Sequence, residues 1–270
     1  MNVNFFVTCI GDALKSRMAR DSVLLLEKLG CRVNFPEKQG CCGQPAINSG
    51  YIKEAIPGMK NLIAALEDND DPIISPAGSC TYAVKSYPTY LADEPEWALR
   101  AEKVAGRMQD LTSFIVNKLG VVDVGASLQG RAVYHPSCSL TRKLGVKEEP
   151  LTLLKNVRGL ELLTFADQDT CCGFGGTFSV KMAEISGEMV KEKLIYYPVV
   201  SREEYPHRGH ITDLMMSGKM FEDIGLPMMN PEHDRRCCRL MVIHSRSSCR
   251  HKPARYGLAQ VVPALANRVS

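Results

Sequence analysis

The chain begins with three short segments, VNFFVTC at residues 3–9, GCRVNF at 30–35 and CCG at 41–43. The same order of segments returns later as RAVYHPSC at 131–138, GLELLTF at 159–165 and CCG at 171–173. In the first copy Cys9 precedes Cys41 by 32 positions, and in the second Cys138 precedes Cys171 by 33. Two copies with matched spacing indicate that one structural unit has been duplicated.

Each copy predicts strands that alternate with helices. Short apolar, β-branched runs predict buried parallel strands at 3–8, 31–35 and 72–75 in the first copy and at 131–135 and 160–165 in the second. Helical spacing of apolar residues predicts helices at 12–29, 51–66, 82–91, 96–119, near 148–157 and at 177–193. We therefore expect an α/β fold of two repeated units, each a parallel sheet flanked by helices.

The last part of the chain differs in composition from the rest. Residues 194–270 hold eleven Lys/Arg against seven Asp/Glu, a net charge of +4 within a chain total of +3, and five of the six histidines. We expect a first unit with its connecting helix at 1–120, a truncated second unit at 121–193 and a divergent, basic, solvated or disordered tail at 194–270. The abrupt change suggests a shifted reading frame or a divergent replacement.

Cysteines dominate the chemistry that the sequence can offer. The chain has 270 residues, eleven of them cysteines, and no apolar run of the roughly 18 residues that span a bilayer. From its first residues we expect no secretory signal. Its small net charge gives no reason to expect nucleic acid. These features predict a protein of the reducing cytosol, where so many thiols serve metal or redox chemistry rather than disulfides.

The predicted strands bring distant cysteines to one edge of the fold. Ligands of parallel sheets lie beyond the carboxyl ends of the strands, and each Cys-Cys-Gly follows a strand and precedes a helix. A glycine after two cysteines allows unusual backbone angles and close approach to a bulky cluster, which suits Gly43 and Gly173. Thiolates are soft ligands for iron–sulfur clusters, zinc or copper(I), and the spacing alone does not choose among them.

Four stretches carry a more specific resemblance: CCGQPAINSGY at 41–51, SPAGSCTYAVKSYP at 75–88, YHPSC at 134–138 and CCGFGGTFSVKMAEIS at 171–186. They resemble the cysteine-rich CCG domain found in the heterodisulfide reductase B subunit, and within that group the lactate utilisation protein A family. The resemblance covers about the first 193 residues, roughly seven-tenths of the chain. It implies an iron–sulfur subunit of a cytoplasmic, multi-subunit system that oxidises L-lactate to pyruvate, working with other iron–sulfur subunits.

The family pattern implies the metal ligands residue by residue. In the first unit they are Cys9, Cys41, Cys42 and Cys80, and in the second Cys138, Cys171 and Cys172. Ala77 stands where the family has a further cysteine. The fourth thiolate of the second unit is expected near residue 210, where His210 stands. The side chains that could substitute for it are His210, Cys237, Cys238, Cys249 and His251. The cofactor implied is an iron–sulfur cluster, with a 4Fe-4S cluster expected and zinc as the alternative.

Two other functions stay open at this point. The first unit's four thiolates could close a tetrahedral zinc site, which would make the protein a structural scaffold without redox activity. A thiol redox sensor is a weaker possibility, because a disulfide between neighbouring residues is strained. Cys31 is expected to be a small buried core residue. His135 could tune a cluster or handle protons, or be a core histidine with a backbone partner.

Overall fold

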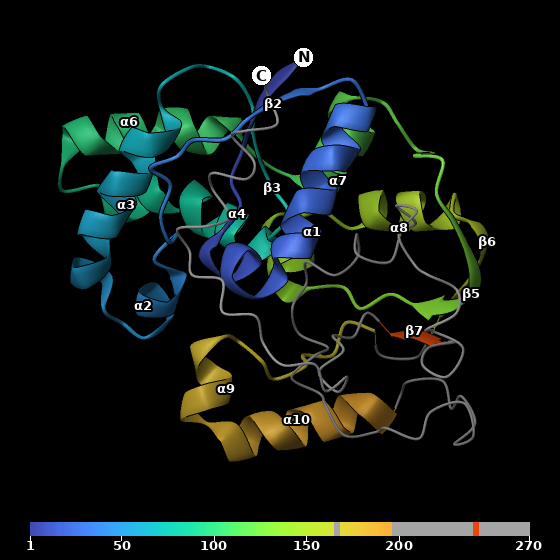
Figure 1. Cartoon of the computed structure of the whole chain (residues 1–270). Coiled ribbons are helices and arrows are strands. Elements are labelled where there is room, and N and C mark those ends of the chain that lie inside the picture. The colour runs from blue at the N-terminus through green and yellow to red at the C-terminus, as the bar shows by residue number, and fades with distance from the viewer. Residues whose placement is uncertain (165–167, 196–239, 243–270) are drawn as a thin grey trace, which may run out of the picture.

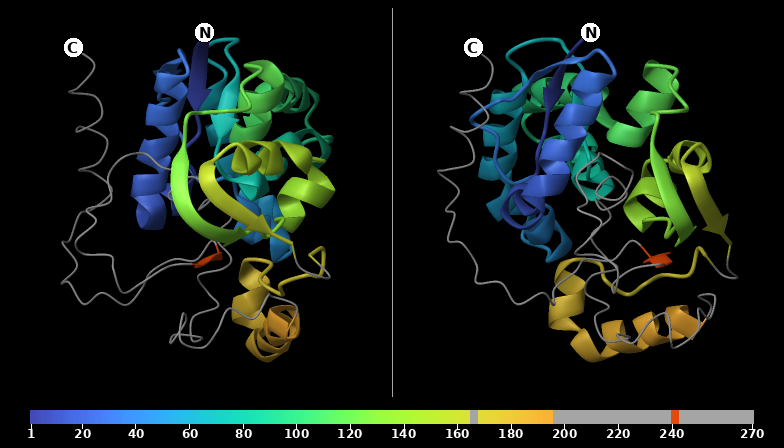
Figure 2. Two further views of the ribbon diagram at one scale, coloured as in Figure 1. Left: turned by 90° about the vertical axis from the view of Figure 1, so that its right-hand side faces the viewer. Right: turned by 45° about the vertical axis from the view of Figure 1, so that its right-hand side comes forward.

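The computed structural model describes residues 1–164, 168–195 and 240–242. They form an α/β fold with two parallel sheets and helices packed around them, as Figures 1 and 2 show. The predicted fold class is confirmed. Nearly all of the tail at 194–270 lies outside the described residues, so its expected character stays a prediction.

The first sheet has the order β2-β1-β3-β4, and all its pairings are parallel. Its strands are β1 (Asn2–Phe5), β2 (Arg32–Asn34), β3 (Ile73–Ser75) and β4 (Met108–Asp110). The side chain of Asn4 is buried in the central strand and is satisfied by two neighbours. Its Nδ2 donates to Asn69 Oδ1 at 2.6 Å, and its Oδ1 accepts from Asn34 Nδ2 at 2.6 Å. A buried amide is tolerated in a strand only when it is paired in this way.

Helices cover both faces of this sheet. One face packs against α1 (Cys9–Lys28), and the other packs against α3 (Ile52–Leu66), α4 (Gly78–Lys85) and α6 (Pro95–Arg107). The short helices α2 (Gln44–Asn48) and α5 (Tyr87–Tyr90) complete the unit. Pro57 lies inside α3, which continues past it as a single helix.

One predicted element is wrong. The helix expected at 96–119 is interrupted, because α6 ends at Arg107 and residues Met108–Asp110 form β4 before α7 (Leu111–Ser113) and the π-helix η1 (Phe114–Lys118) begin. Met108 is fully buried beside β3, so pairing with the sheet outweighs local helical preference. Asp110 then starts the next helix, since its carboxylate accepts hydrogen bonds from the backbone N–H groups of Thr112 and Ser113.

The second unit repeats the plan with a smaller sheet of order β6-β5-β7. Its elements are β5 (Ser127–Val133), π-helix η2 (Ser139–Lys143), α8 (Glu148–Lys155), β6 (Arg158–Leu163), α9 (Thr177–Lys181), α10 (Ala183–Ile195) and β7 (Leu240–Val242). The single helix expected at 177–193 is thus two helices, separated at Met182. Strand β7 comes from the tail and pairs in parallel with β5.

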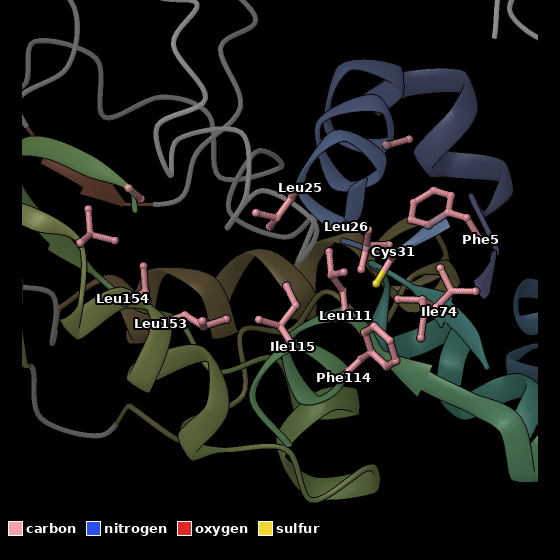
Figure 3. Close-up of a cluster of buried hydrophobic side chains, with 14 of the residues drawn as sticks. Phe5, Leu25, Leu26, Cys31, Ile74, Leu111, Phe114, Ile115, Leu153 and Leu154 are labelled. Carbon is pink, nitrogen blue, oxygen red and sulfur yellow. The ribbon is translucent and has the colours of Figure 1, made fainter. Parts of the chain in front are cut away.

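A continuous apolar cluster joins the two units. It contains Phe5, Leu26 and Cys31 of the first unit together with Leu153 and Leu154 of the second, and η1 lies between them (Figure 3). Cys31 is 6% exposed and packs among these side chains, as expected of a core cysteine. The units therefore share a core, which fixes the position of one cysteine edge relative to the other.

No helix within the described ranges is long and apolar enough to cross a membrane.

Candidate metal centre

The cysteines of the first unit lie beyond the carboxyl ends of three neighbouring strands. Cys9 is the first residue of α1 and follows β1, which ends at Phe5. Cys41 and Cys42 precede α2, and Cys80 lies in the first turn of α4, which follows β3. We call Cys9, Cys41, Cys42 and Cys80 the first thiol group.

The turn before Cys9 is unusual in its backbone. Thr8 has a φ of 68°, and it is the only residue other than glycine with a positive φ among those described. Its side-chain Oγ1 accepts a hydrogen bond from the N–H of Gly11 at 3.2 Å and so caps α1. This constrained turn fixes where the helix starts and thereby places the Cys9 thiol.

The Cys-Cys-Gly turn presents its two thiols to different surroundings. Cys41 is exposed, whereas Cys42 is 2% exposed and belongs to the core beneath α3, α4 and α6. Gly43 has a φ of 74° and is the N-cap of α2. A side chain at this φ is strained, so glycine is required for the turn itself, as the sequence predicted.

The first thiol group forms a series of neighbouring pairs. The sulfur atoms of Cys9 and Cys41 are 3.5 Å apart. The pKa of Cys41 is raised, chiefly by its contact with the Cys42 thiol and then by burial. The Cys41 thiol lowers the pKa of Cys42, but the Cys80 thiol and burial raise it more, so the net shift is upward. Each thiol thus lies against the next, although the four come from three separate segments.

Tyr87 stabilises the turn that carries Cys41 and Cys42, a role that the sequence did not predict. The phenol of Tyr87 is buried, and its Oη donates a 2.8 Å hydrogen bond to the backbone carbonyl of Cys42. Burial raises the pKa of Tyr87, and the thiols of Cys42, Cys41 and Cys80 raise it further. The phenol therefore stays protonated and holds the Cys-Cys-Gly turn in place.

The second thiol group consists of Cys138, Cys171 and Cys172. Cys138 directly precedes η2, and the other two precede Gly173, whose φ is 75°. A Cβ on Gly173 would lie 2.8 Å from the carbonyl oxygen of Ser186, so the turn packs tightly on α10. Burial raises the pKa of Cys138 and of Cys172, and in both the neighbouring cysteines add to the shift.

Lys193 is a second residue that the sequence analysis missed. It is 3% exposed at the end of α10, and its Nζ donates to the carbonyls of Gln168 at 2.8 Å and Thr170 at 2.5 Å. Burial lowers the pKa of Lys193, while the thiols of Cys172, Cys138 and Cys171 raise it. A buried ammonium therefore lies near the three thiols, where it favours the anionic form of Cys138 and Cys172.

His135 lies in the same surroundings. Burial, together with the Lys193 charge, lowers the pKa of His135 to about 4, so its imidazole is neutral. Its Nδ1 is buried and has no hydrogen-bond partner within the part of the chain that the structure describes. Among these residues, therefore, no backbone group is the expected partner of Nδ1.

Two elements next to the thiol groups, one from each unit, meet in a tight contact. Helix α4, which carries Cys80, packs on η2, which begins just after Cys138. A Cβ on Gly78 would lie 3.1 Å from Cβ of Leu140, and the Lys143 ammonium lies 4.4 Å from the centre of the Tyr82 ring. The contact joins the segment that carries Cys80 to the segment that follows Cys138.

The chemistry of these side chains suits a soft metal centre. Seven thiols gather in two groups, each beside a positive-φ glycine that lets backbone approach a bulky ligand. The described residues contain no set of three or more His, Cys, Asp or Glu side chains already arranged around one ion position. The ligand roles of the seven cysteines and the contacts of Gly43 and Gly173 with a cofactor stay predictions.

Comparison with known proteins places these groups in context. The cysteine-rich domain family named CCG matches residues 3–85 and 132–197, the two ranges that contain the repeated segments. Uncharacterized protein YkgE of Escherichia coli K12 is 88% identical over 221 residues, which cover 82% of this chain and 92% of that protein. Lactate utilization protein A is 52% identical in Bacillus velezensis and 50% in Bacillus subtilis, over 72% of this chain and 81% of each relative. The match to the E. coli protein covers more of the chain than the seven-tenths expected.

Proposed function

The chain belongs to the lactate utilisation protein A family of cysteine-rich CCG proteins, and we propose that it is an iron–sulfur, electron-transfer subunit of a multi-subunit system that oxidises L-lactate to pyruvate. The observation that carries this proposal is the convergence of four thiols, from three distant segments, at one edge of a parallel sheet. Thiols gathered in this way suit a soft metal centre.

The first thiol group would hold an iron–sulfur cluster, with a 4Fe-4S cluster expected, through Cys9, Cys41, Cys42 and Cys80. When bound, such a cluster supplies one-electron transfer at a potential set by its ligands, hydrogen bonds and burial. Cys42 and Tyr87 provide the buried side of this site, and Cys9 and Cys41 the exposed side. The chain's own contribution is to gather the thiolates, exclude water from one side and keep the other side accessible.

The second thiol group would hold a second cluster through Cys138, Cys171 and Cys172. Lys193 offsets the negative charge that these thiolates gain on binding, since its ammonium already lies beside them. Because α4 packs on η2, the two centres would be neighbours within one rigid core. That arrangement supports electron relay from one centre to the other and onward to partner subunits of the iron–sulfur class, in the cytosol.

The test is metal and sulfide analysis of the full chain after anaerobic purification. We expect iron and acid-labile sulfide in comparable amounts and a broad visible absorption, which zinc thiolates lack. The variant Cys42→Ser should lose much of the iron, whereas the control Cys31→Ala, which removes a core thiol outside both groups, should keep it. Stoichiometric zinc without sulfide would establish the scaffold alternative instead, and a reconstituted protein without any iron would refute the cofactor.

A further inference from the structure

The second thiol group is one donor short of the four that usually hold a cluster or a tetrahedral metal ion. Its three thiols are Cys138, Cys171 and Cys172, and the chain has no cysteine near residue 210, where the family pattern implies the fourth. The missing donor must come from elsewhere, or the site stays open. A side chain that is buried near the thiols, has a free lone pair and lacks a hydrogen-bond partner is the candidate to look for.

His135 meets these conditions. It follows strand β5, which ends at Val133, and lies three positions before Cys138 in the same short connection. Its Nδ1 is buried without a partner among the described residues, although a buried polar atom is nearly always paired in a folded protein. An unpaired nitrogen at this place is explained if it pairs with a group other than the described residues, such as a bound metal.

Lys193 shows that His135 and the thiols occupy one neighbourhood. Its ammonium interacts electrostatically with His135 and with all three thiols of the second thiol group. It also holds the carbonyl of Thr170, the residue directly before Cys171, at 2.5 Å. Because electrostatic interactions weaken with distance, these interactions place His135 and the three thiols in the same region of the fold.

We propose that Nδ1 of His135 is the fourth ligand of the second centre, which makes that centre a three-cysteine, one-histidine site. The inference rests on the proposed function, because it assumes that the second thiol group binds a cluster. Histidine nitrogen replaces cysteine on iron in some iron–sulfur centres, where the neutral ligand raises the reduction potential. The two centres of this chain would then differ in potential, the second being the higher.

The experiment detects the nitrogen directly and does not depend on lactate oxidation. The full chain is labelled with ¹⁵N-histidine, carries Cys42→Ser to suppress the first site, and is examined by pulsed EPR after dithionite reduction. Iron per chain is measured on the same samples. The test variants are His135→Ala and His135→Cys, and the control is His210→Ala, which removes the histidine that stands where the family has its fourth cysteine.

We expect a ¹⁵N coupling of the size found for directly bound histidine in the Cys42→Ser protein and in the His210→Ala control. The coupling should vanish in His135→Ala together with iron from the second site. His135→Cys should keep that iron, lose the coupling and shift the potential to a lower value. Because His135→Cys retains four donors, it answers the question even if His135→Ala fails to fold.

Other results overturn the inference in distinguishable ways. A coupling that survives in His135→Ala and vanishes in His210→Ala would assign the ligand to His210. A second cluster without any histidine coupling, or a Cys42→Ser protein without iron beside an iron-loaded parent chain, would refute the His135 ligand and leave the first site intact. Absence of iron from the parent chain as well would refute the proposed function itself.

Discussion

The Oη atom of Tyr87 donates a 2.8 Å hydrogen bond to the carbonyl oxygen of Cys42, and both residues are buried in the core of the first unit. Replacing Tyr87 by Phe leaves this carbonyl without its partner inside the protein. We expect the free energy of unfolding to fall by ~1–3 kcal/mol, the usual cost of an unsatisfied buried polar group. Urea unfolding of the metal-free protein measures the change. Tyr90→Phe, in the same helix α5, is the matched control and should change stability by less than about 0.5 kcal/mol.

Gly43 and Gly106 should respond to alanine in opposite directions. Gly43 has a φ of 74°, where a side chain costs ~1–2 kcal/mol, so Gly43→Ala should destabilise the protein. Gly106 lies in the last turn of α6, where no atom lies within 4 Å of an added Cβ, and Gly106→Ala should stabilise the protein by up to ~0.5–1 kcal/mol. Urea unfolding of the two variants checks the signs. A neutral Gly43→Ala would show that the Cys-Cys-Gly turn does not require its left-handed conformation.

Gly78 controls how closely the two units approach. A Cβ at this position would lie 3.1 Å from Cβ of Leu140 and 3.3 Å from its Cα, so the neighbouring backbone would have to move. We expect Gly78→Ala to destabilise the protein by ~1–3 kcal/mol, as overpacking does. Gly58→Ala is the control, because Gly58 lies in α3 with no atom near its added Cβ. Equal stability of the two variants in urea would mean that the units adjust without cost.

The buried carboxyl group of Asp110 makes the stability of the protein depend on pH, and the direction of its pKa shift gives the sign. It is buried, and desolvation raises its pKa above the usual 3.8 despite hydrogen bonds from Thr112 and Ser113. The native state therefore binds the proton more tightly than the unfolded state, and stability falls as pH rises from about 3.8 through the raised value. Asp110→Asn keeps an oxygen acceptor for the cap and removes the buried charge.

We accordingly expect Asp110→Asn to be at least as stable as the parent protein at pH 7 and to lose this advantage at about pH 4. Unfolding in urea at both pH values measures the difference. Asp110→Ala removes the cap as well and should cost ~1 kcal/mol at pH 7. A parent protein that gains stability steadily from pH 4 to pH 7 relative to Asp110→Asn would contradict the assigned direction.

The fold was largely predictable from the sequence because its signals are local. Buried apolar runs such as 72–75 and the helical spacing of 12–29 gave the strands and helices with small errors at their ends. Strand β4 was missed because Met108–Asp110 lies inside a longer stretch with helical periodicity, and three residues are too few to break that pattern. Only its pairing with β3, a tertiary contact, selects the extended conformation.

The sequence predicted only those residues of the site that belong to a recognisable motif. The two Cys-Cys-Gly motifs single out the thiols, and the alternation of strands and helices explains why they meet at one edge. Tyr87 and Lys193 were missed because their roles depend on contacts far along the chain. Tyr87 contacts a carbonyl 45 positions away, and no local feature distinguishes it from Tyr90. Lys193 resembles any lysine near a helix end until the fold buries it beside the second thiol group.

Metal removal should expose the proposed ligands to alkylation and leave the core thiol untouched. In the metal-loaded protein we expect Cys9, Cys41 and Cys80 to react slowly with iodoacetamide, because a coordinated sulfur has no free thiolate. After anaerobic removal of iron with a chelator, exposed Cys9 should react first, and buried Cys42 should react last of the group. Because the pKa of Cys41 is raised, this thiol should react with iodoacetamide more slowly than an ordinary exposed thiol at pH 8.

Mass spectrometry of peptides after timed labelling gives the rate for each cysteine, and Cys31 is the internal control. Cys31 lies in the core shared by the two units and should react only in urea, whether or not metal is present. Protection that depends on metal at Cys9 but not at Cys31 separates coordination from simple burial. Equal labelling rates at Cys9 before and after iron removal would show that Cys9 is not a ligand, and the first site would then have to be assigned to the remaining three thiols.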